Sequence, residues 1–451
     1  MVAFGAALFL SFGSAAAAPP ARYGGSLGLE GVRGLDAPST ATPALITASG
    51  ARFEGLYART DAGCVPQLAE APIEWSADRA RIRLRPKLAL HDGRVLGASE
   101  VVAWLERALR SGSPAAHLAP FVRGGLDWLE GRGDGPAVRI VDERTLELGL
   151  IAPLPELECL LARPEMRVFA RDSRGVPVGT GPFARHPRDP SRLVAFTAHR
   201  EGRPFLDELV LGGGSPSTAR LGFGAGRSCP NVRELLVLAV GRLSPPVEAW
   251  QRVASAIDRQ RLVDRFLPPG SAPAHGLLEE GMPVPAPSGP ANGTLHAVLV
   301  VPEDLPGGLA LAQRAQLELL RAGVSVTLES RTRGAVEALR EHGRYELLLD
   351  RVAVGTSASP FEALTELLAL GTRFGRPDLA PAAWLEAVFR ADPDGAERQV
   401  SRFAAEVRQT LRIAVLAEIP QGPRLPEGLS GARTTPACGV ALADAHWQRD
   451  L

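Results

Sequence analysis

The sequence predicts an α/β protein with more than one compact unit. Its 451 residues are 45% hydrophobic and 22% charged, which is enough apolar material to bury a large core. In the second half, a nearly continuous apolar strand at 295–301 precedes helical spacing over 309–320 and an alternating strand from Val324 to Leu328. Gly323 is placed to end that helix, so this segment predicts a βαβ unit.

The remaining elements mix strands with helices. In the first half, residues 82–85 alternate as a half-buried strand, and Ser99 is placed to cap a helix with one apolar face. Residues 138–148 predict a second strand. Further along, a helix over 334–342 leads to a strand over 345–349, so the second half is α/β throughout.

Charge and the N-terminus restrict the class of partner. Lysine plus arginine equals aspartate plus glutamate at 50 each, so no net field attracts nucleic acid or anionic lipid. The apolar run 2–12 is followed by small residues, which is typical of a secretory signal peptide removed after residue 18. The alternative is a buried N-terminal strand or helix.

No other stretch approaches the roughly 20 apolar residues that a membrane span needs, so we expect a soluble mature chain.

The cysteines Cys64, Cys159, Cys229 and Cys438 are far apart and form no C-x-x-C pair. This spacing does not favour a metal or redox motif. In an oxidising compartment the chain has room for zero, one or two disulfides, with three full connectivities. The other interpretation is that some of them are small buried hydrophobic residues.

Motifs that carry catalysis are missing from the sequence. It lacks G-x-S-x-G, H-E-x-x-H and a phosphate-binding P-loop. Gly222, Gly224 and Gly226 predict a plain turn, and His91 with Asp92 also reads as a turn. We therefore expect a protein that is not an enzyme, with no catalytic residue, no metal site and no cofactor.

A series of short motifs along the chain is the most specific feature of the sequence for assigning a family resemblance. The motifs are Tyr23–Leu27, Leu35–Pro38, Phe53–Leu56, Leu68–Glu70, Ile82–Pro86, Leu90–Gly93, Ala98–Val102, Gly179–Phe183, Phe205–Leu209 and Ala256–Arg259. In this order they resemble the extracellular solute-binding proteins of family 5, which include oligopeptide, dipeptide and nickel binders. Most of the motif residues have structural roles by type, because the glycines permit turns and the acids satisfy backbone donors or arginines.

The resemblance implies a two-lobed periplasmic binding protein fold of type II, in the large family 5 variant with an extra subdomain in the first lobe. After the signal peptide 1–18, the first-lobe core would comprise 19–50, 178–234 and 415–451. The extra subdomain would be 51–177, and the second lobe 235–414. Two segments would cross between the lobes, near 235–241 and 411–419, and hinge bending would enclose the ligand.

The function implied is that of a periplasmic substrate-binding component of an ABC importer. Such a monomeric protein would capture a small or peptide-like solute and deliver it to a permease in the inner membrane. The alternative is a divergent member that acts as a sensor or envelope scaffold without transport. An extracytoplasmic hydrolase has little support, because no nucleophile with a matched base is visible.

Ligand contacts are predicted only from positions between the lobes. They are Asp36, Ser39, Arg242, Thr356, Ser357 and Ser359. Peptide binders of the family tend to carry a tryptophan and an aspartate where this chain has Ala353 and Thr356, and an asparagine where it has Gly241. A neutral threonine does not offset an ammonium group in a dry cleft, so these departures weaken the expectation of an ordinary peptide ligand.

Overall fold

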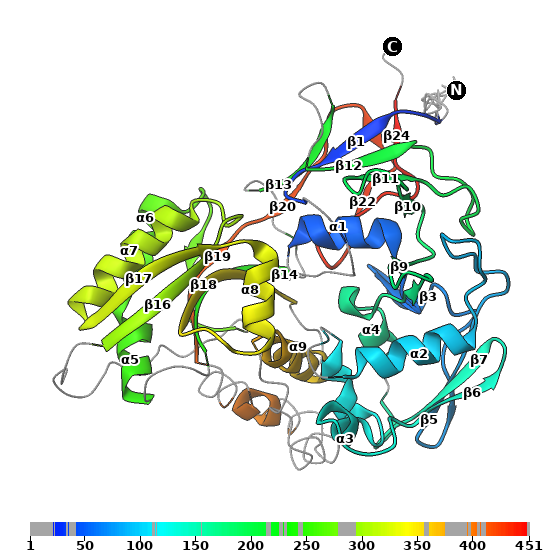
Figure 1. The fold of residues 1–451 in the computed structure, drawn as a ribbon, viewed down its shortest axis with the longest axis horizontal. Helices are drawn as coiled ribbons and strands as arrows, with labels where there is room; N and C mark the ends of the chain where they lie inside the picture. The colour runs from blue at the N-terminus through cyan, green and yellow to red at the C-terminus, as the bar shows by residue number, and fades with distance from the viewer. Residues whose placement is uncertain are drawn as a thin grey trace, which may run out of the picture.

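The computed structural model describes residues 21, 23–32, 35, 42–110, 113, 115–154, 156–212, 218–224, 229, 232–241, 247–277, 295–355, 360–374, 395, 398–403, 406 and 412–448, and every structural statement below concerns these residues. They include two six-stranded sheets and a four-stranded sheet. In Figure 1 the first six-stranded sheet lies at the upper right, the second at the left and the four-stranded sheet at the lower right.

The first sheet contains strands from both ends of the chain. In spatial order its strands are β10 (Phe183–Arg185), β11 (Arg192–Ala195), β12 (Glu208–Leu211), β1 (Ser26–Leu29), β13 (Arg220–Gly224) and β20 (Gly422–Arg424). Helix α1 (Pro43–Arg52) covers it through Ala44, Ala48 and Ala51. The helix begins after Thr42, whose hydroxyl accepts the Leu45 N–H at 3.2 Å.

The second sheet confirms the predicted βαβ unit. Its strands, in spatial order, are β15 (Ala272–Pro273), β19 (Ile413–Ile419), β14 (Val232–Val240), β18 (Leu347–Gly355), β16 (Leu295–Pro302) and β17 (Val324–Arg331). Helix α7 (Gly308–Arg321) connects the parallel pair β16 and β17. Gly323 follows it with φ +78°, a left-handed conformation that suits glycine. Strand β18 starts two residues later than the predicted strand and runs to Gly355.

The two predicted crossing segments are neighbours in this sheet, because β14 pairs antiparallel with β19. Alternate β14 side chains enter different cores. Leu236 and Leu238 pack in the cluster that includes residues of α5 (Val247–Ala256), α6 (Arg259–Phe266) and α7, while Leu235 and Val237 belong to the cluster that includes α8 (Arg333–Glu341) and α9 (Pro360–Arg373). Burial on both faces explains why β14 is almost wholly apolar.

The four-stranded sheet corrects one sequence prediction. Its order is β4 (Glu74–Ser76), β5 (Arg79–Arg83), β7 (Thr145–Gly149) and β6 (Val138–Asp142). The stretch 138–148 is thus a hairpin and not one strand. The Asp142 carboxylate accepts the Arg144 N–H at 2.8 Å and closes the turn, a local bond that competes with extended structure.

Short helices accompany this sheet. They are α2 (Ala98–Ala108), η1 (Ala116–Phe121), α3 (Gly125–Leu129), α4 (Leu157–Leu161) and η2 (Pro164–Met166). The prediction that Ser99 caps α2 was wrong, because the helix starts at Ala98 and its N-cap is Gly97. The Gly97 N–H donates to Glu100 Oε2 at 3.0 Å, so the glutamate supplies the cap. None of the described helices is long and apolar enough to cross a bilayer.

Of the two turns predicted from glycine and histidine residues, one is wrong and the other is confirmed. Gly222 and Gly224 lie in strand β13 and not in a turn, while Gly226 is outside the described residues. A Cβ at Gly222 would lie 2.5 Å from Glu30 Oε2, so a larger residue there would displace the end of the Glu30 side chain. The His91–Asp92 turn is confirmed, with Gly93 at φ +87°. Burial lowers the pKa of His91 to about 4.

All four cysteines are paired, which resolves the open question of connectivity. Cys64 bonds Cys159, and Cys229 bonds Cys438, with Cα–Cα distances of 5.3 and 5.5 Å. The first disulfide joins the hairpin of β2 (Tyr57–Thr60) and β3 (Gly63–Pro66) to α4. The remaining strand pairs are β8 (Ala170–Arg171) with β9 (Pro177–Val178), β21 (Leu429–Ser430) with β24 (His446–Trp447), and β22 (Arg433–Thr434) with β23 (Val440–Ala441).

Two buried carboxylates of the second sheet differ in their environments. Asp350 is fully buried and accepts hydrogen bonds from Arg333, Arg340 and the Arg351 N–H. Glu234 pairs with Arg351 at 2.9 Å, but its second oxygen has no hydrogen-bond partner. Burial, opposed by Arg351 and Arg333 and assisted by the neighbouring Asp350, raises the pKa of Glu234 to about 7.

Gly181→Ala should lower the free energy of unfolding by about 2–3 kcal/mol, the range expected for an overpacked site. A Cβ there would lie 2.6 Å from the Ala51 carbonyl oxygen at the end of α1. Urea titration measures the change. The control is Gly334→Ala in α8, where a Cβ meets nothing within 4 Å and alanine favours the helix. Equal stability of the two variants would contradict the packing argument.

Glu234 should make stability fall as pH rises. The pKa of Glu234 is about 7 in the folded protein but 4.5 for an ordinary glutamate. As the pH rises, the unfolded chain therefore releases this proton at a lower pH than the folded protein does. The contribution of Glu234 is complete below pH 4.5 and lost through pH 7, a change of about 3 kcal/mol. Urea titrations from pH 4.5 to 8 should show a shallower decline for Glu234→Gln. Glu418→Gln, at a partly exposed carboxylate on β19, should retain the wild-type decline; identical profiles for all three proteins would refute the assignment.

Candidate functional site

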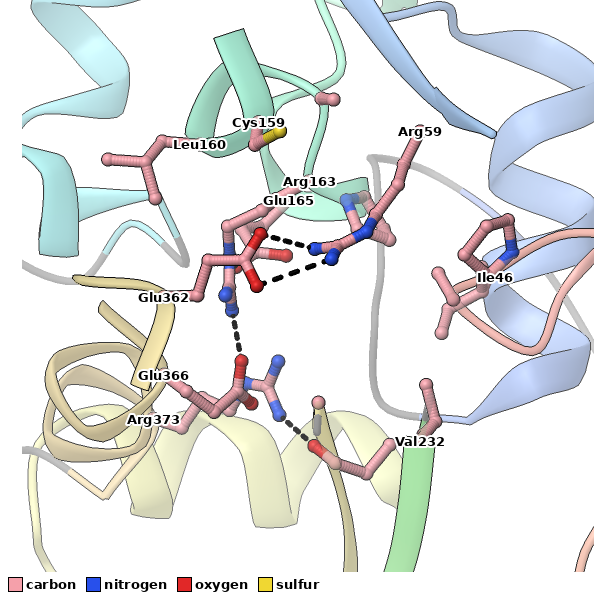
Figure 2. A pocket seen from close by; sticks show the side chains of 16 residues that line it. Ile46, Arg59, Cys159, Leu160, Arg163, Glu165, Val232, Glu362, Glu366 and Arg373 are labelled. Carbon is pink, nitrogen blue, oxygen red and sulfur yellow. Dashed lines mark hydrogen bonds and ion pairs between the residues drawn. The ribbon is translucent and has the colours of Figure 1, made fainter. Parts of the chain in front are cut away.

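A cavity of about 100 Å³ lies where α1, the Cys64–Cys159 region and α9 meet. Its lining is contributed by Ile46, Pro436 and Ala437 on the first-sheet side, by Arg59, Cys159, Leu160, Ala162, Arg163, Pro164 and Glu165 beside the disulfide, and by Val232, Ala353, Gly355, Glu362, Glu366 and Arg373 from the second sheet and α9. Figure 2 shows charged side chains from different elements converging on this space. Segments far apart in the sequence therefore form one cavity.

Arg59 and Glu362 form an ion pair across the cavity. The two guanidinium nitrogens donate to the two carboxylate oxygens at 2.8 and 3.2 Å, as the dashed lines in Figure 2 show. Arg59 comes from β2, and Glu362 from the first turn of α9. This two-point geometry is the strong form of an arginine–carboxylate contact. It fixes the orientation of both side chains as well as their distance.

Arg163 makes the second contact with α9. It lies 2.7 Å from Glu366 and 2.5 Å from Glu165, and all three side chains are largely buried. We refer to Arg59–Glu362 and Arg163–Glu366 as the bridging ion pairs. Burial disfavours the charge on Glu165, but Arg163, His117 and Arg373 outweigh it and lower the pKa of Glu165 to about 2. The Glu165 carboxylate is therefore ionised at neutral pH.

The charges of the described lining balance. Arg59, Arg163 and Arg373 face Glu165, Glu362 and Glu366. Arg373 also donates to the Ala353 carbonyl oxygen at 2.9 Å, and burial lowers its pKa. Balanced opposite charges cancel at a distance, so these groups act on a ligand through short contacts and not through a net field.

The predicted ligand residues Asp36, Ser39, Arg242, Thr356, Ser357 and Ser359 all lie outside the described residues. Their roles stay predictions. Their described neighbours Ala353 and Gly355 line the cavity, so the segment that ends β18 is next to the site. Gly241 has a structural explanation, because a Cβ there would lie 1.8 Å from the Tyr345 carbonyl oxygen. With this backbone arrangement, an asparagine at 241 would not fit.

Sequence reasoning missed the charged residues of the cavity. Arg59, Arg163 and Arg373 are three of many arginines, and nothing local distinguishes them. One signal was present in α9, where Glu362 and Glu366 stand one turn apart in an otherwise largely apolar helix. Two carboxylates on one face of such a helix require cationic partners from elsewhere in the chain.

The comparisons agree with this architecture. Residues 63–227 match the family model described as bacterial extracellular solute-binding proteins, family 5 middle. No curated protein matches the chain. Among solved structures, the chain is similar to OppA of Haemophilus influenzae in complex with RPPGFSPFR, with 13% identity and a TM-score of 0.74 over 95% of this chain and 100% of that one.

Two other structures have the same fold. The murein tripeptide binding protein MppA of Escherichia coli is 15% identical, with a TM-score of 0.72 over 95% of this chain and 99% of that one. NikA of Staphylococcus aureus in complex with Ni(L-His)₂ is 14% identical, with a TM-score of 0.68 over 95% and 100%. These likenesses confirm the two-lobed α/β fold. The chain therefore has the fold of these solute-binding proteins, and its middle segment, residues 63–227, is similar in sequence to family 5.

Proposed function

We propose that this protein captures a small solute between two lobes outside the cytoplasm and delivers it to an ABC importer. The supporting observation is the cavity, whose lining comes from the first-sheet side, the disulfide region and α9. Related folds hold a peptide or Ni(L-His)₂, which supports solute capture by this scaffold. An exported, monomeric binding component would then meet the permease in the inner membrane.

The two large sheets support a division of the chain into two lobes, whose proposed boundaries fall within strands β14 and β19. The first-lobe core would be 19–50, 178–234 and 415–451, with the extra subdomain at 51–177 and the second lobe at 235–414. Strands β14 and β19 carry the chain between the two large sheets and pair with each other. Because both connections lie side by side, the lobes have a single place about which to bend. Closure by such bending would bury a solute against α9.

The solute should be smaller than the peptide RPPGFSPFR. The cavity measures about 100 Å³, while pockets for drug-sized ligands are on the order of 300–1,000 Å³. Its walls also contain apolar groups, including Ile46, Leu160 and Val232. A compact solute with both polar and apolar parts fits such a lining.

Solute binding by protein purified without refolding is the central test. Calorimetry against peptide, sugar, amine and metal libraries should find one class that binds, and X-ray scattering should show a smaller radius of gyration in the complex. Ala353→Phe, which fills the cavity wall, should weaken affinity at least tenfold. Ala310→Phe, on the exposed side of α7, is the control and should bind like wild type. Absence of binding by any class would reject solute capture.

A sensor or envelope scaffold without transport is the second candidate. The bridging ion pairs favour it, because they fill part of the cavity with the chain's own charged groups. Cross-linking in the native envelope followed by affinity purification separates the two functions. Recovery of an ABC permease supports transport, whereas recovery of a receptor or envelope complex without permease supports the scaffold.

A further inference from the structure

The bridging ion pairs depend on two arginines that come from separate segments. Arg59 lies on β2, and Arg163 lies two residues beyond the end of α4. Their partners Glu362 and Glu366 are one turn apart on α9. Both arginines must therefore be held at positions that match one helical turn, a rise of about 5–6 Å, if both pairs are to form together.

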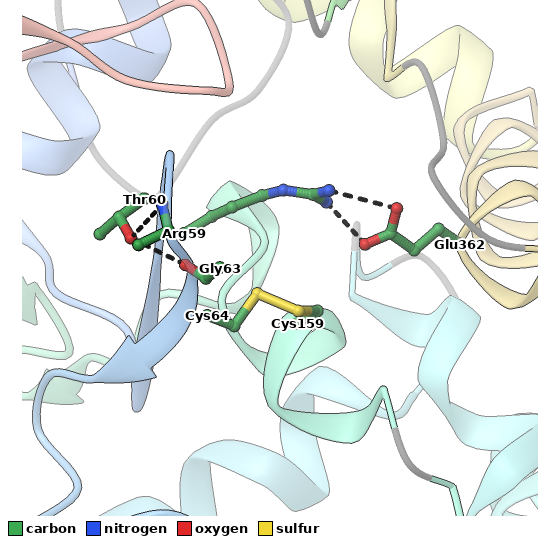
Figure 3. The surroundings of a disulfide bond; sticks show 7 residues. Arg59, Thr60, Gly63, Cys64, Cys159 and Glu362 are labelled. Carbon is green, nitrogen blue, oxygen red and sulfur yellow. Dashed lines mark hydrogen bonds and ion pairs between the residues drawn. A yellow bond between two sulfur atoms is a disulfide. The ribbon is translucent and has the colours of Figure 1, made fainter.

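The Cys64–Cys159 disulfide joins those two segments. Arg59 and Cys64 are directly paired across the β2–β3 hairpin, so their side chains extend to the same face. Figure 3 shows Arg59 extending toward Glu362 beside this disulfide. Cys159 belongs to α4, and Arg163 follows it by one turn. One covalent bond thus connects the residue opposite Arg59 with the helix that leads to Arg163.

Apart from the disulfide, the hairpin is held by noncovalent packing of both strands on α4 and by the buried Tyr57. Strands β2 and β3 form a sheet of only two strands, and their burial is partial beyond Tyr57. An isolated two-stranded hairpin is marginally stable in water. The Thr60 hydroxyl donates to the Gly63 carbonyl oxygen at 2.9 Å, but this bond lies within the hairpin itself. The disulfide is therefore a major constraint on where Arg59 points.

The positions of the arginines matter because an ion pair contributes little stability when its formation must also order two mobile side chains. Arg59 is 35% exposed, so its contact with Glu362 competes with hydration and with side-chain entropy. A prearranged guanidinium avoids much of that cost. Arg163 is already fixed by Glu165 and meets Glu366 with less loss of freedom.

We propose that the Cys64–Cys159 disulfide positions Arg59 and Arg163 for the bridging ion pairs and so favours the closed arrangement of the lobes before any solute binds. This proposal rests on the hinge closure in the proposed function, but not on the identity of the solute. Without the disulfide, only noncovalent packing holds the hairpin to α4, and the place where Arg59 meets Glu362 is less fixed. The lobes then open more often.

A double-mutant cycle in the solute-free protein tests the coupling. Dyes on genetically encoded azido residues at Arg192 in β11 and Leu317 in α7, both exposed, would report the ratio of closed to open molecules by single-molecule energy transfer. Arg59→Gln should lower this ratio about tenfold, as should the double change Cys64→Ser with Cys159→Ser. Adding Arg59→Gln to the double-serine protein should then have almost no further effect.

The second disulfide supplies the matched control. In a protein with Cys229→Ser and Cys438→Ser, Arg59→Gln should keep its full tenfold effect, because this disulfide does not join the arginine segments. General destabilisation would leave the effect of Arg59→Gln unchanged in both backgrounds. That result overturns the proposal, as does equal suppression by both disulfide variants or an unchanged ratio in Arg59→Gln.

Reduction of folded wild-type protein provides a second route if the Cys64 and Cys159 double variant does not fold. A phosphine reductant opens accessible disulfides, and mass spectrometry after alkylation identifies which pair has opened. Molecules with only the Cys64–Cys159 bond reduced should populate the open state, and reoxidation should restore closure. Molecules that stay closed after this bond is reduced would refute the positioning role. Failure of every solute to bind would bear on the proposed function and leave this result intact.

Discussion

Strands β14 and β19 lie side by side in the second sheet, and this pair contributes side chains to the hydrophobic cores on both faces of that sheet. Leu236 and Leu238 enter the core under α5, α6 and α7, whereas Leu235 and Val237 enter the core shared with α9. Apolar burial on both faces holds the strand pair rigidly. The cavity forms at one end of it, where Val232 begins β14.

Buried charge is the second constraint. The chain contains a single lysine, Lys87, so arginine supplies nearly all of its side-chain cations. A guanidinium has five N–H donors in a planar fork and can serve two carboxylates at once. Arg163 does so with Glu165 and Glu366, and Arg333 does so with Asp304 and Asp350. Each shared arginine thus satisfies two acids. Glu234 has one oxygen without a donor, and burial raises its pKa.

Local sequence patterns predicted the elements that are determined by residues close together in the sequence. The unit from β16 through α7 to β17 followed from apolar periodicity and the glycine at 323. Errors occurred where a short side-chain bond redirected the backbone, as at Asp142 and at Gly97 with Glu100. The charged lining of the cavity could not be predicted in this way. Arg59 and Glu362 are 303 residues apart, and no periodicity links positions at that distance. Only the pair of glutamates in α9 gave a local hint.

The Cys229–Cys438 bond has a topological consequence for the whole molecule. The two cysteines flank the stretch from β14 to β19, so the bond closes a covalent ring that contains all of the second sheet and its helices. A protease that cuts anywhere between β14 and β19 therefore breaks the ring but does not release a fragment. The outer parts of the chain, which build the first sheet, stay attached to each other through sulfur even after such a cut.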